Sequence, residues 1–405
     1  MRGKKRGIIM KLTLSDPIVV AHGPLHEVVD WGPWQFPSLR KGDDGTLYAG
    51  LGIGADNWSE HGNEDGMKWF RSFDGGMTWE DCPKGMEALG LPAAKNGDRF
   101  EATTLKPMNV DASVFDGVEP VHRLYLDKDT PFMDFIRFED LKPGTVDATV
   151  PFKVLRKGAD KTETVFPKIV GKDLGLCISR PYGENILLHP HLFGRMRVAP
   201  DGALWQMDYG RGMINGKFSD TFTAYYYRSD DNGETWEKVS KLDPLENEAA
   251  TYYCEQDIAW MDDRHAITTL RSNGLQIATS DDGGYTWSKS RKIAEFGVDP
   301  AVCALKCGAI LVTYGRPGFL VMPCFDGKGE KWEEPIEIVP TADNSWKLYD
   351  QSKHGNSAEW GTCSYSDIVP MSDNEALIVY TDFFYPDKEG VRRKTLLVIK
   401  ATVEE

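Results

Sequence analysis

The octapeptide Ser280-Asp-Asp-Gly-Gly-Tyr-Thr-Trp287 decides the fold of this chain, because the chain contains it three times. The other copies are Ser72-Phe-Asp-Gly-Gly-Met-Thr-Trp79 and Ser229-Asp-Asp-Asn-Gly-Glu-Thr-Trp236, and all three fit SxDxGxTW. In such a peptide the Asp and Ser side chains bond the amides of a turn, Gly supplies positive φ, and Thr-Trp opens a strand. The repeat therefore predicts hairpins in which these residues are structural.

Short apolar runs separated by Asp-Gly turns surround the octapeptides and form six similar units. Each unit reads as strand, turn, strand, hairpin and strand, and Phe325–Trp332 resembles a decayed octapeptide. In the second unit, which is the least regular, 123–126 and 152–155 are the clearest strands. The units cover about 35–80, 98–155, 189–239, 254–287, 298–338 and 357–401.

This pattern predicts an all-β fold, a six-bladed β-propeller of four-stranded antiparallel blades, in one domain over 11–405. The ring has to close, and the apolar segments 12–14 and 17–21 are expected to pair with the last sheet beside 395–400. Residues 156–187 are interpreted as an insertion or long connection. Residues 1–10 are interpreted as a leader or tag-like segment, because their apolar part is too short for a signal peptide.

Composition excludes several classes of function. The net charge of -15 argues against a nucleic-acid partner, since phosphate contacts require clustered Lys and Arg. The seven cysteines form no CxxC pair, so the sequence signals no metal site, no other cofactor and no disulfide framework. No apolar run is long enough to span a bilayer, and we expect a cytoplasmic protein without a membrane partner.

Polar residues at the ends of the inner strands are the candidates for chemistry, because these strands line the channel of a propeller. Taken singly, such a residue is more often an ordinary surface or turn residue. The shared placement of these residues in their units favours a common site. Glu255 and Tyr365 lie on or before first strands. Asp56, Arg211, Arg271, Arg316 and Asp382 follow second strands.

With these residues the sequence resembles the sialidase (neuraminidase) superfamily, whose members are six-bladed propellers that carry the octapeptides as Asp boxes. The family's Glu on a first strand, followed by a carboxylate-binding Arg and an Asp box, resembles Glu255, Arg271 and Ser280–Trp287. Its Tyr nucleophile lies in a Tyr-Ser motif that Tyr365-Ser366 resembles. Its next carboxylate-binding Arg is matched by Arg316.

The chain departs from the family pattern at two positions. Where the family has Arg-Ile-Pro, this chain has Gln35-Phe36-Pro37, so the first Arg of the triad is replaced by Gln35. The family's Glu that orients this Arg is replaced by Thr381, and Asp382 follows one residue later. The joint loss of an Arg and its partner suggests a changed substrate pocket, in which Gln35, Arg211 and Asp382 are further candidates for substrate binding.

The family's acid/base residue is an Asp in the loop after the first unit's second strand. In this chain that loop offers several choices. Asp56 and Glu60 are the preferred candidates, and His61 is an alternative because its ordinary pKa lies near neutrality. A solvated acidic loop without a catalytic role is an equally good reading of each residue.

The resemblance implies a Tyr nucleophile, which suits a substrate with a carboxylate at the reacting carbon, because a neutral phenol avoids repulsion. Tyr is largely protonated at neutral pH, so a neighbouring carboxylate such as Glu255 has to accept its proton. Arg271 and Arg316 are suited to hold a carboxylate through paired hydrogen bonds.

Three functions follow from this reading. The first is a sialidase-like exo-glycoside hydrolase that removes a terminal acidic sugar, either sialic acid-like or a uronic acid, from an acidic oligosaccharide. The second is a propeller polysaccharide lyase or other glycosidase that acts on a uronate-containing glycan. The third is a glycan-binding propeller without catalysis, because Asp boxes occur in such proteins as well.

Overall fold

The structure is a computed structural model, which describes residues 10–25, 31–54, 56, 66–103, 108–142, 144, 147–180, 186–188, 194–244, 250–340 and 361–404. The chain divides into two compact units. Unit 1 consists of Met1–Gly90 and Phe296–Glu405, and unit 2 consists of Leu91–Glu295. Each unit is described by itself.

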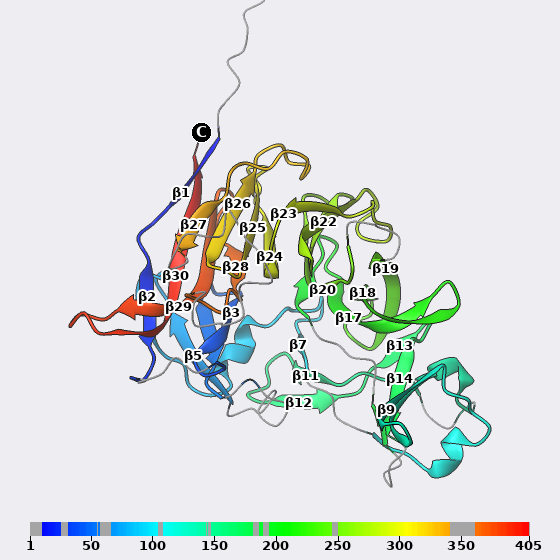
Figure 1. The fold of residues 1–405 in the computed structure, drawn as a ribbon. Helices are drawn as coiled ribbons and strands as arrows, with labels where there is room; N and C mark the ends of the chain where they lie inside the picture. Colours follow the sequence, from blue (N-terminus) through cyan, green and yellow to red (C-terminus); the bar gives the residue numbers. More distant parts are fainter. Residues whose placement is uncertain are drawn as a thin grey trace, which may run out of the picture. The chain divides into compact units, whose positions relative to one another are not determined.

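Strands form nearly all of the regular structure in the described residues (Figure 1). The helices among these residues are short 3-10 turns, η2 (Met86–Gly90), η3 (Ala112–Phe115) and η4 (Phe138–Asp140). None of them is long and apolar enough to cross a membrane. The prediction of an all-β fold is confirmed.

Unit 1 contains three antiparallel sheets among its described residues. The first sheet has the order β3 (Gln35–Lys41), β4 (Leu47–Gly52), β5 (Met67–Ser72) and β6 (Glu80–Asp81). The second has the order β24 (Val298–Ala304), β25 (Ile310–Gly315), β26 (Phe319–Cys324) and β27 (Ile336–Val339). The third is built on β28 (Asp367–Pro370), β29 (Glu375–Pro386) and β30 (Arg392–Glu404).

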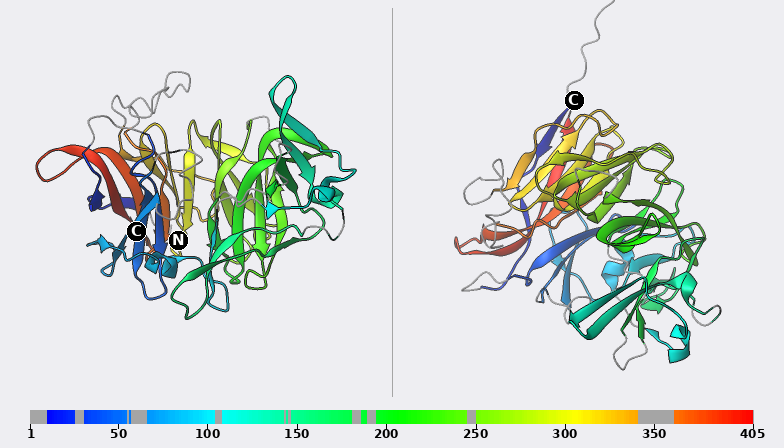
Figure 2. Two further views of the ribbon diagram at one scale, coloured as in Figure 1. Left: turned by 90° about the horizontal axis from the view of Figure 1, so that it is seen from below. Right: turned by 45° about the vertical axis from the view of Figure 1, so that its right-hand side comes forward.

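The third sheet joins the beginning of the chain to its end. Both β1 (Lys11–Leu14) and β2 (Ile18–His22) pair antiparallel with β30, as the sequence predicted. Lys11 lies opposite Glu404 and Ile18 lies opposite Val398. The hairpin of β29 and β30 continues past β28 to the pair Pro386 and Arg392, and Figure 2 shows it projecting in red.

The first strand of several sheets begins with the same backbone irregularity. Phe36, Asp299 and Ser364 in unit 1 and Glu255 in unit 2 all have positive φ, between 42° and 63°. The register shifts at the same points of β3, β24 and β20, which is the signature of a β-bulge. A bulge redirects the side chains beside it, and here it does so next to the predicted site residues.

Hydrogen bonds connect the inner strands of unit 1. Ser366, just before β28, shares a hydrogen bond of 2.8 Å with Thr313 of β25. Asp367 of β28 accepts a hydrogen bond of 3.3 Å from the amide of Leu39 in β3. Ser366, Thr313 and Asp367 are buried, and buried polar groups are retained where they are paired in this way. These bonds hold β28 between its two neighbours.

Unit 2 contains four sheets among its described residues. Three of them have the orders β12-β11-β7, β13-β19-β18-β17-β16 and β20-β21-β22-β23. Their strands are β7 (Arg99–Ala102), β11 (Phe152–Leu155), β12 (Thr162–Val165), β13 (Lys168–Val170), β16 (Met196–Val198), β17 (Leu204–Ile214), β18 (Lys217–Ser229), β19 (Thr235–Leu242), β20 (Cys254–Trp260), β21 (Ala266–Ser272), β22 (Gly274–Ser280) and β23 (Arg291–Ala294). Asp257 of β20 forms a bidentate ion pair with Arg197 of β16, both contacts at 2.9 Å, which joins two of these sheets.

The fourth sheet of unit 2 corrects the interpretation of the second repeat. It has the order β8 (Met108–Asn109), β15 (Ile186–Leu188), β14 (Leu176–Arg180), β10 (Thr130–Arg137) and β9 (His122–Asp127). The strand predicted over 123–126 is β9, so it does not share a sheet with β11. Of the range 156–187, β12 and β13 pair with β11 and β19, whereas β14 pairs with β10. Local sequence pattern cannot show which distant strand completes a sheet.

The three Asp boxes form the predicted hairpin turns. In the first box Asp74 accepts from the amides of Met77 and Thr78 and from the Thr78 hydroxyl, at 2.6 to 3.0 Å. Asp231 and Asp282 bond the corresponding threonines at the same distances within 0.1 Å. The bonding residues of this motif therefore have a structural role, because they stabilise a turn.

The box tryptophans pack against neighbouring sheets. Trp236 is buried and stacks on Phe152 of β11 at 4.7 Å between ring centres. Trp287 lies 5.0 Å from the ring of Tyr226 in β18. Burial of a large apolar side chain stabilises the folded state by about 1.5–3 kcal/mol, so each of these boxes holds one sheet against the next.

The predicted decayed box also forms a turn of the same kind. Asp326 accepts hydrogen bonds from the amides of Lys328 and Gly329. Trp332 Nε1 donates to the carbonyl of Gly329 at 2.9 Å, as Trp79 does to Gly76 in the first box. Cys324 takes the place of the first Ser, since its Sγ contacts Asp326 Oδ1 at 3.0 Å. One extra residue between Asp326 and the Trp hides this copy from a pattern of fixed spacing.

Candidate functional site

Unit 1 brings Arg316 and Tyr365 together with three aromatic side chains, Trp31, Phe36 and Phe383. We call these five residues the Trp31 cluster. The Arg316 Cζ atom lies 4.9 Å from the ring centre of Trp31 and 5.7 Å from that of Tyr365. The ring of Phe36 meets Tyr365 edge to face at 4.9 Å, and Trp31 meets Phe36 and Phe383 in the same way. A guanidinium between aromatic faces gains cation–π energy and has a fixed orientation.

The backbone around Arg316 places its side chain in the cluster. Arg316 has a φ of 63°, and its amide donates to the carbonyl of Gly318 at 3.1 Å. A Cβ atom at Gly315 would lie 2.8 Å from Ser364 Oγ and closer still to the Gly318 carbonyl oxygen. Ser364 Oγ donates to that same oxygen at 2.8 Å. The glycine before Arg316 is therefore a steric requirement of the turn.

Arg316 is also anchored through Cys363 and Thr381. Arg316 Nη2 donates to the carbonyl oxygen of Cys363 at 2.8 Å. The Cys363 thiol lies 3.1 Å from the hydroxyl of Thr381, and both side chains are fully buried. Burial raises the pKa of the Cys363 thiol, so the group is a neutral packing partner. Thr381, which replaces the Glu of the family pattern, thus supports the residue that holds Arg316.

Gln35, the other departure from the family pattern, is wholly buried at the start of β3. Its Oε1 accepts a hydrogen bond of 3.1 Å from the amide of Gly32. Its Nε2 has no hydrogen-bond partner among the residues that the structure describes. Gln35 therefore stabilises the segment that carries Trp31, and its predicted contact with substrate stays a prediction.

Asp56 lies beside the Trp31 cluster. Its Oδ2 accepts a hydrogen bond of 2.7 Å from Nε1 of Trp31, and its side chain is exposed. An exposed carboxylate next to a fixed aromatic ring has the access that an acid/base residue requires. The other two candidates, Glu60 and His61, lie outside the described residues.

Asp382 lies half-buried on β29, between Thr381 and Phe383. Burial raises its pKa, against the lowering effects of the Phe384 amide and of Arg392. The Phe384 amide donates to Asp382 Oδ1 at 2.7 Å. A carboxyl group with a raised pKa is a reasonable proton donor, and the predicted role of Asp382 in substrate binding stays a prediction.

Unit 2 brings together the other predicted pair, Glu255 and Arg271. Arg271 Nη1 donates to both carboxylate oxygens of Glu255 at 3.0 Å, and Glu255 has only 11% of its side chain exposed. Arg271 ends β21 opposite Cys254, and the bulge at Glu255 turns its carboxylate toward the guanidinium. The resemblance matched these two residues to the family's Glu and Arg by their order and spacing, and the structure places their side chains in contact, whereas their predicted roles stay predictions.

Tyr252 belongs to the same group but was not predicted. Its hydroxyl donates to the carbonyl of Ser272 at 2.9 Å, next to Arg271 in the chain. Burial raises the pKa of Tyr252, and the positive charge of Arg271 acts in the opposite direction. A Tyr three residues before a first-strand Glu is the signal that sequence reasoning overlooked.

Arg211 lies in the extended hairpin of β17 and β18. Its Nε forms an ion pair with Asp220 across the hairpin. Its guanidinium is 5.5 Å from the ring centre of Phe222 and 5.9 Å from that of Phe135. These contacts give Arg211 a structural role in unit 2, and substrate binding by Arg211 stays a prediction.

The described residues contain no group of three or more His, Cys, Asp or Glu side chains that fits a metal ion. The Trp31 cluster offers a phenol, a cation and a carboxylate, and unit 2 offers a carboxylate with its guanidinium partner. Nucleophilic attack, proton transfer and anion binding are all within the reach of these groups.

The comparisons with known proteins agree with the Asp boxes. The model of the BNR/Asp-box repeat matches residues 227–238, which include the second box. A sialidase from a Hadza microbial source has a similar structure, with a TM-score of 0.51 and 16% identity over 90% of this chain and 65% of that chain. The chain has a sialidase-like fold.

A second solved structure is similar to this chain over nearly its whole length. It is a protein of unknown function from Dyadobacter fermentans, with a TM-score of 0.57 and 15% identity over 96% of this chain and 98% of that one. No curated protein sequence matches the chain. At these identities the likeness concerns the fold, and the sialidase-like chain spans less than two thirds of the microbial sialidase.

Proposed function

We propose that this sialidase-like protein is an exo-glycoside hydrolase that removes a terminal acidic sugar from a glycan. The observation that carries the proposal is the position of the Arg316 guanidinium beside the Tyr365 ring, at 5.7 Å. A phenol beside a fixed cation suits the attack on a carbon that bears a carboxylate. Glycosidase chemistry also agrees with the likeness to a sialidase fold.

The architecture that we propose for this function is a six-bladed β-propeller. Six of the seven sheets among the described residues follow the repeat read from the sequence. The remaining sheet, β8-β15-β14-β10-β9, takes β8, β9 and β10 from the range of the irregular second unit and β14 and β15 from the chain after it. We propose that this sheet is an insertion and that the other six are the blades.

In the proposed reaction Tyr365 is the nucleophile. A base accepts the phenol proton, a role that the family resemblance gives to Glu255. The Tyr365 oxygen bonds to the anomeric carbon, and the bond to the aglycone breaks. Asp56 donates a proton to the leaving oxygen, with Glu60 and His61 as the alternative donors. Water, deprotonated by the same acid/base residue, then attacks the anomeric carbon, and the bond from this carbon to the Tyr365 oxygen breaks. The phenolate takes back its proton from the base, and the sugar is released.

Two arginines are candidates for binding a substrate's carboxylate, Arg316 in unit 1 and Arg271 in unit 2. Both are oriented by neighbours, Arg271 by Glu255 and Arg316 by Trp31 and Cys363. Because Gln35 replaces a third arginine, the clamp carries less positive charge than the family pattern. We therefore propose a modified nonulosonic acid as substrate in preference to ordinary sialic acid. A uronic acid, whose carboxylate is not on its anomeric carbon, is the alternative.

The test is a panel of fluorogenic glycosides of sialic acid, a deaminated nonulosonic acid, glucuronic acid and galacturonic acid. Wild type is expected to release the sugar from at least one of them, and Tyr365→Phe is expected to release none. A product with an unsaturated, ultraviolet-absorbing sugar ring would replace this proposal by the lyase. Binding of an acidic glycan without turnover, retained in Tyr365→Phe, would replace it by the glycan-binding propeller.

A further inference from the structure

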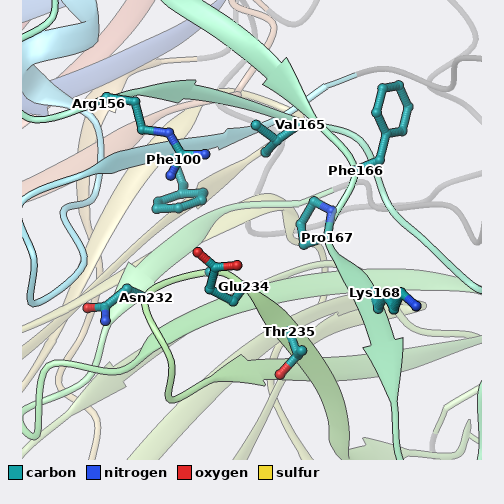
Figure 3. A pocket seen from close by; sticks show the side chains of 10 residues that line it. Phe100, Arg156, Val165, Phe166, Pro167, Lys168, Asn232, Glu234 and Thr235 are labelled. Atoms are coloured by element: carbon teal, nitrogen blue, oxygen red, sulfur yellow. The ribbon is translucent and has the colours of Figure 1, made fainter.

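Unit 2 contains a pocket that the proposed reaction does not use. It has a volume of about 400 Å³, within the range of small-ligand sites. Figure 3 shows Glu234 pointing toward the ring of Phe100, with Asn232 on one side and Pro167 on the other. The residues that line the pocket belong to β7, β12, β13 and β19 and to the turns between them.

The polar side of this pocket is made by the second Asp box. The fixed residues of the box hold the turn, whereas Asn232 and Glu234 occupy positions that the motif leaves free. The first box has Gly75 and Met77 at these positions. Of these two boxes, the second therefore carries an amide and a carboxylate at the positions that the motif leaves free.

Asn232 adopts a conformation that glycine adopts more readily. Its φ is 61°, and the corresponding Gly75 and Gly283 have φ values of 73° and 81°. The Asn232 Oδ1 accepts a hydrogen bond of 3.0 Å from the amide of Asn96, which offsets part of the backbone cost. Its amide nitrogen is left as a donor on the wall of the pocket.

The charges around the pocket indicate the class of ligand. The two cations that line it are already in ion pairs, Arg156 with Asp98 and Glu163, and Lys168 with Asp147. Glu234 is exposed and forms no ion pair with the residues that the structure describes. Carboxylates thus outnumber cations here, and an anionic ligand would be repelled.

We propose that this pocket binds one unit of a neutral sugar chain. The Glu234 carboxylate and the Asn232 amide would bond the sugar hydroxyls, and the apolar face of the ring would lie against the half-buried Val165. Hydroxyl-rich ligands suit such a site, because they need both donors and acceptors and contribute no charge. The site goes beyond the proposed hydrolysis and does not depend on Tyr365.

The test is isothermal titration calorimetry of the full chain with lactose, cellobiose and arabinobiose. At least one of them is expected to bind wild type with one site per chain. Glu234→Ala is expected to weaken that binding about tenfold, because it removes a charge-assisted hydrogen bond. Asn232→Gly is expected to weaken it several-fold, and it leaves the turn intact because two other boxes have glycine there.

The matched control is Met77→Ala, at the position of the first box that corresponds to Glu234, and its binding should equal that of wild type. Tyr365→Phe should also bind with unchanged affinity, which separates this site from the proposed active site. The proposal is overturned if no sugar of the panel binds, or if Glu234→Ala binds as wild type does. Tighter binding of glucuronate than of the neutral sugars, lost in Glu234→Ala, would also overturn it.

Discussion

The indole of Trp31 lies 4.9 Å from the guanidinium of Arg316 and donates from its Nε1 to Asp56 at 2.7 Å. One side chain therefore holds both the cation and the carboxylate of the proposed site in unit 1. The ring face attracts the positive charge and the ring edge binds the negative one. The geometry of this site thus depends on a residue that is itself without acid/base chemistry.

Replacement of Trp31 by Leu is expected to weaken the binding of an acidic sugar. The change removes a cation–π contact worth about 0.5–2 kcal/mol, so affinity for the released sugar acid should fall about 2- to 30-fold. Calorimetric titration of the sugar acid measures this directly. Trp69→Leu is the matched control, because Trp69 carries Arg40 at 4.2 Å in the same unit. Equal losses in the two variants would contradict a specific role for Trp31.

Replacement of Gly315 by Ala is expected to destabilise the turn that carries Arg316. The new Cβ would collide with the Gly318 carbonyl and with Ser364, and overpacking of this kind costs about 1–3 kcal/mol. Urea unfolding should show the loss, and activity should fall with it. Gly210→Ala is the control, since nothing lies within 4 Å of its Cβ and its φ is not positive. An unchanged unfolding midpoint for Gly315→Ala would refute the steric argument.

The Asp boxes are expected to make stability depend on pH in the acidic range. Hydrogen bonds from Thr78 and Ser72 lower the pKa of Asp74 from 3.8 to about 2. A lowered pKa in the folded state adds stability above the ordinary pKa, and this is lost as pH falls through the folded value. Asp74→Asn should therefore be less stable than wild type at neutral pH, and the difference should shrink between about pH 4 and pH 2. Urea unfolding at several pH values measures this, and a constant difference would contradict it.

Asp382 is expected to behave in the opposite way. Its pKa is raised by burial, so its protonated form favours the folded state. This contribution is present below the ordinary pKa and is lost as pH rises through the folded value. Asp382→Asn, which keeps an acceptor for the Phe384 amide, should unfold at a higher temperature than wild type at neutral pH.

The control for this prediction lies on the same hairpin. The pKa of Asp387 is lowered by hydrogen bonds from the amides of Val391 and Glu389 and by Arg393. Asp387→Asn should therefore lower the melting temperature at neutral pH. A lower melting temperature for both variants would show that burial does not control Asp382.

Much of the fold was predictable from the sequence, because local chemistry determines it. The Asp boxes require particular residues at fixed spacing, and all three form the expected turns. Glu255 and Arg271 could be selected as candidates from their order along two successive strands, which pair in the structure. The pairing of β1 and β2 with β30 followed from the need to cover a sheet edge.

The remaining features depend on contacts between distant segments. Trp31 and Arg316 are in contact although they lie far apart in the sequence. No local pattern indicates that an aromatic residue before a strand will contact a cation. In the sheet that contains β9 and β14, β10 pairs with the distant strand β14, so that Asp134 lies opposite Ser179. In the sequence, Thr381 indicates only that the Glu of the family pattern is missing. The contact of its hydroxyl with Cys363 is a property of the folded chain.

The most direct test of the proposed hydrolase is the turnover of acidic glycosides by wild type and Tyr365→Phe, with both proteins shown to be folded. Because Tyr365 is the proposed nucleophile, the account predicts sugar release by wild type and a loss of at least about a thousandfold in the variant. A variant that releases the sugar at the wild-type rate would contradict the account.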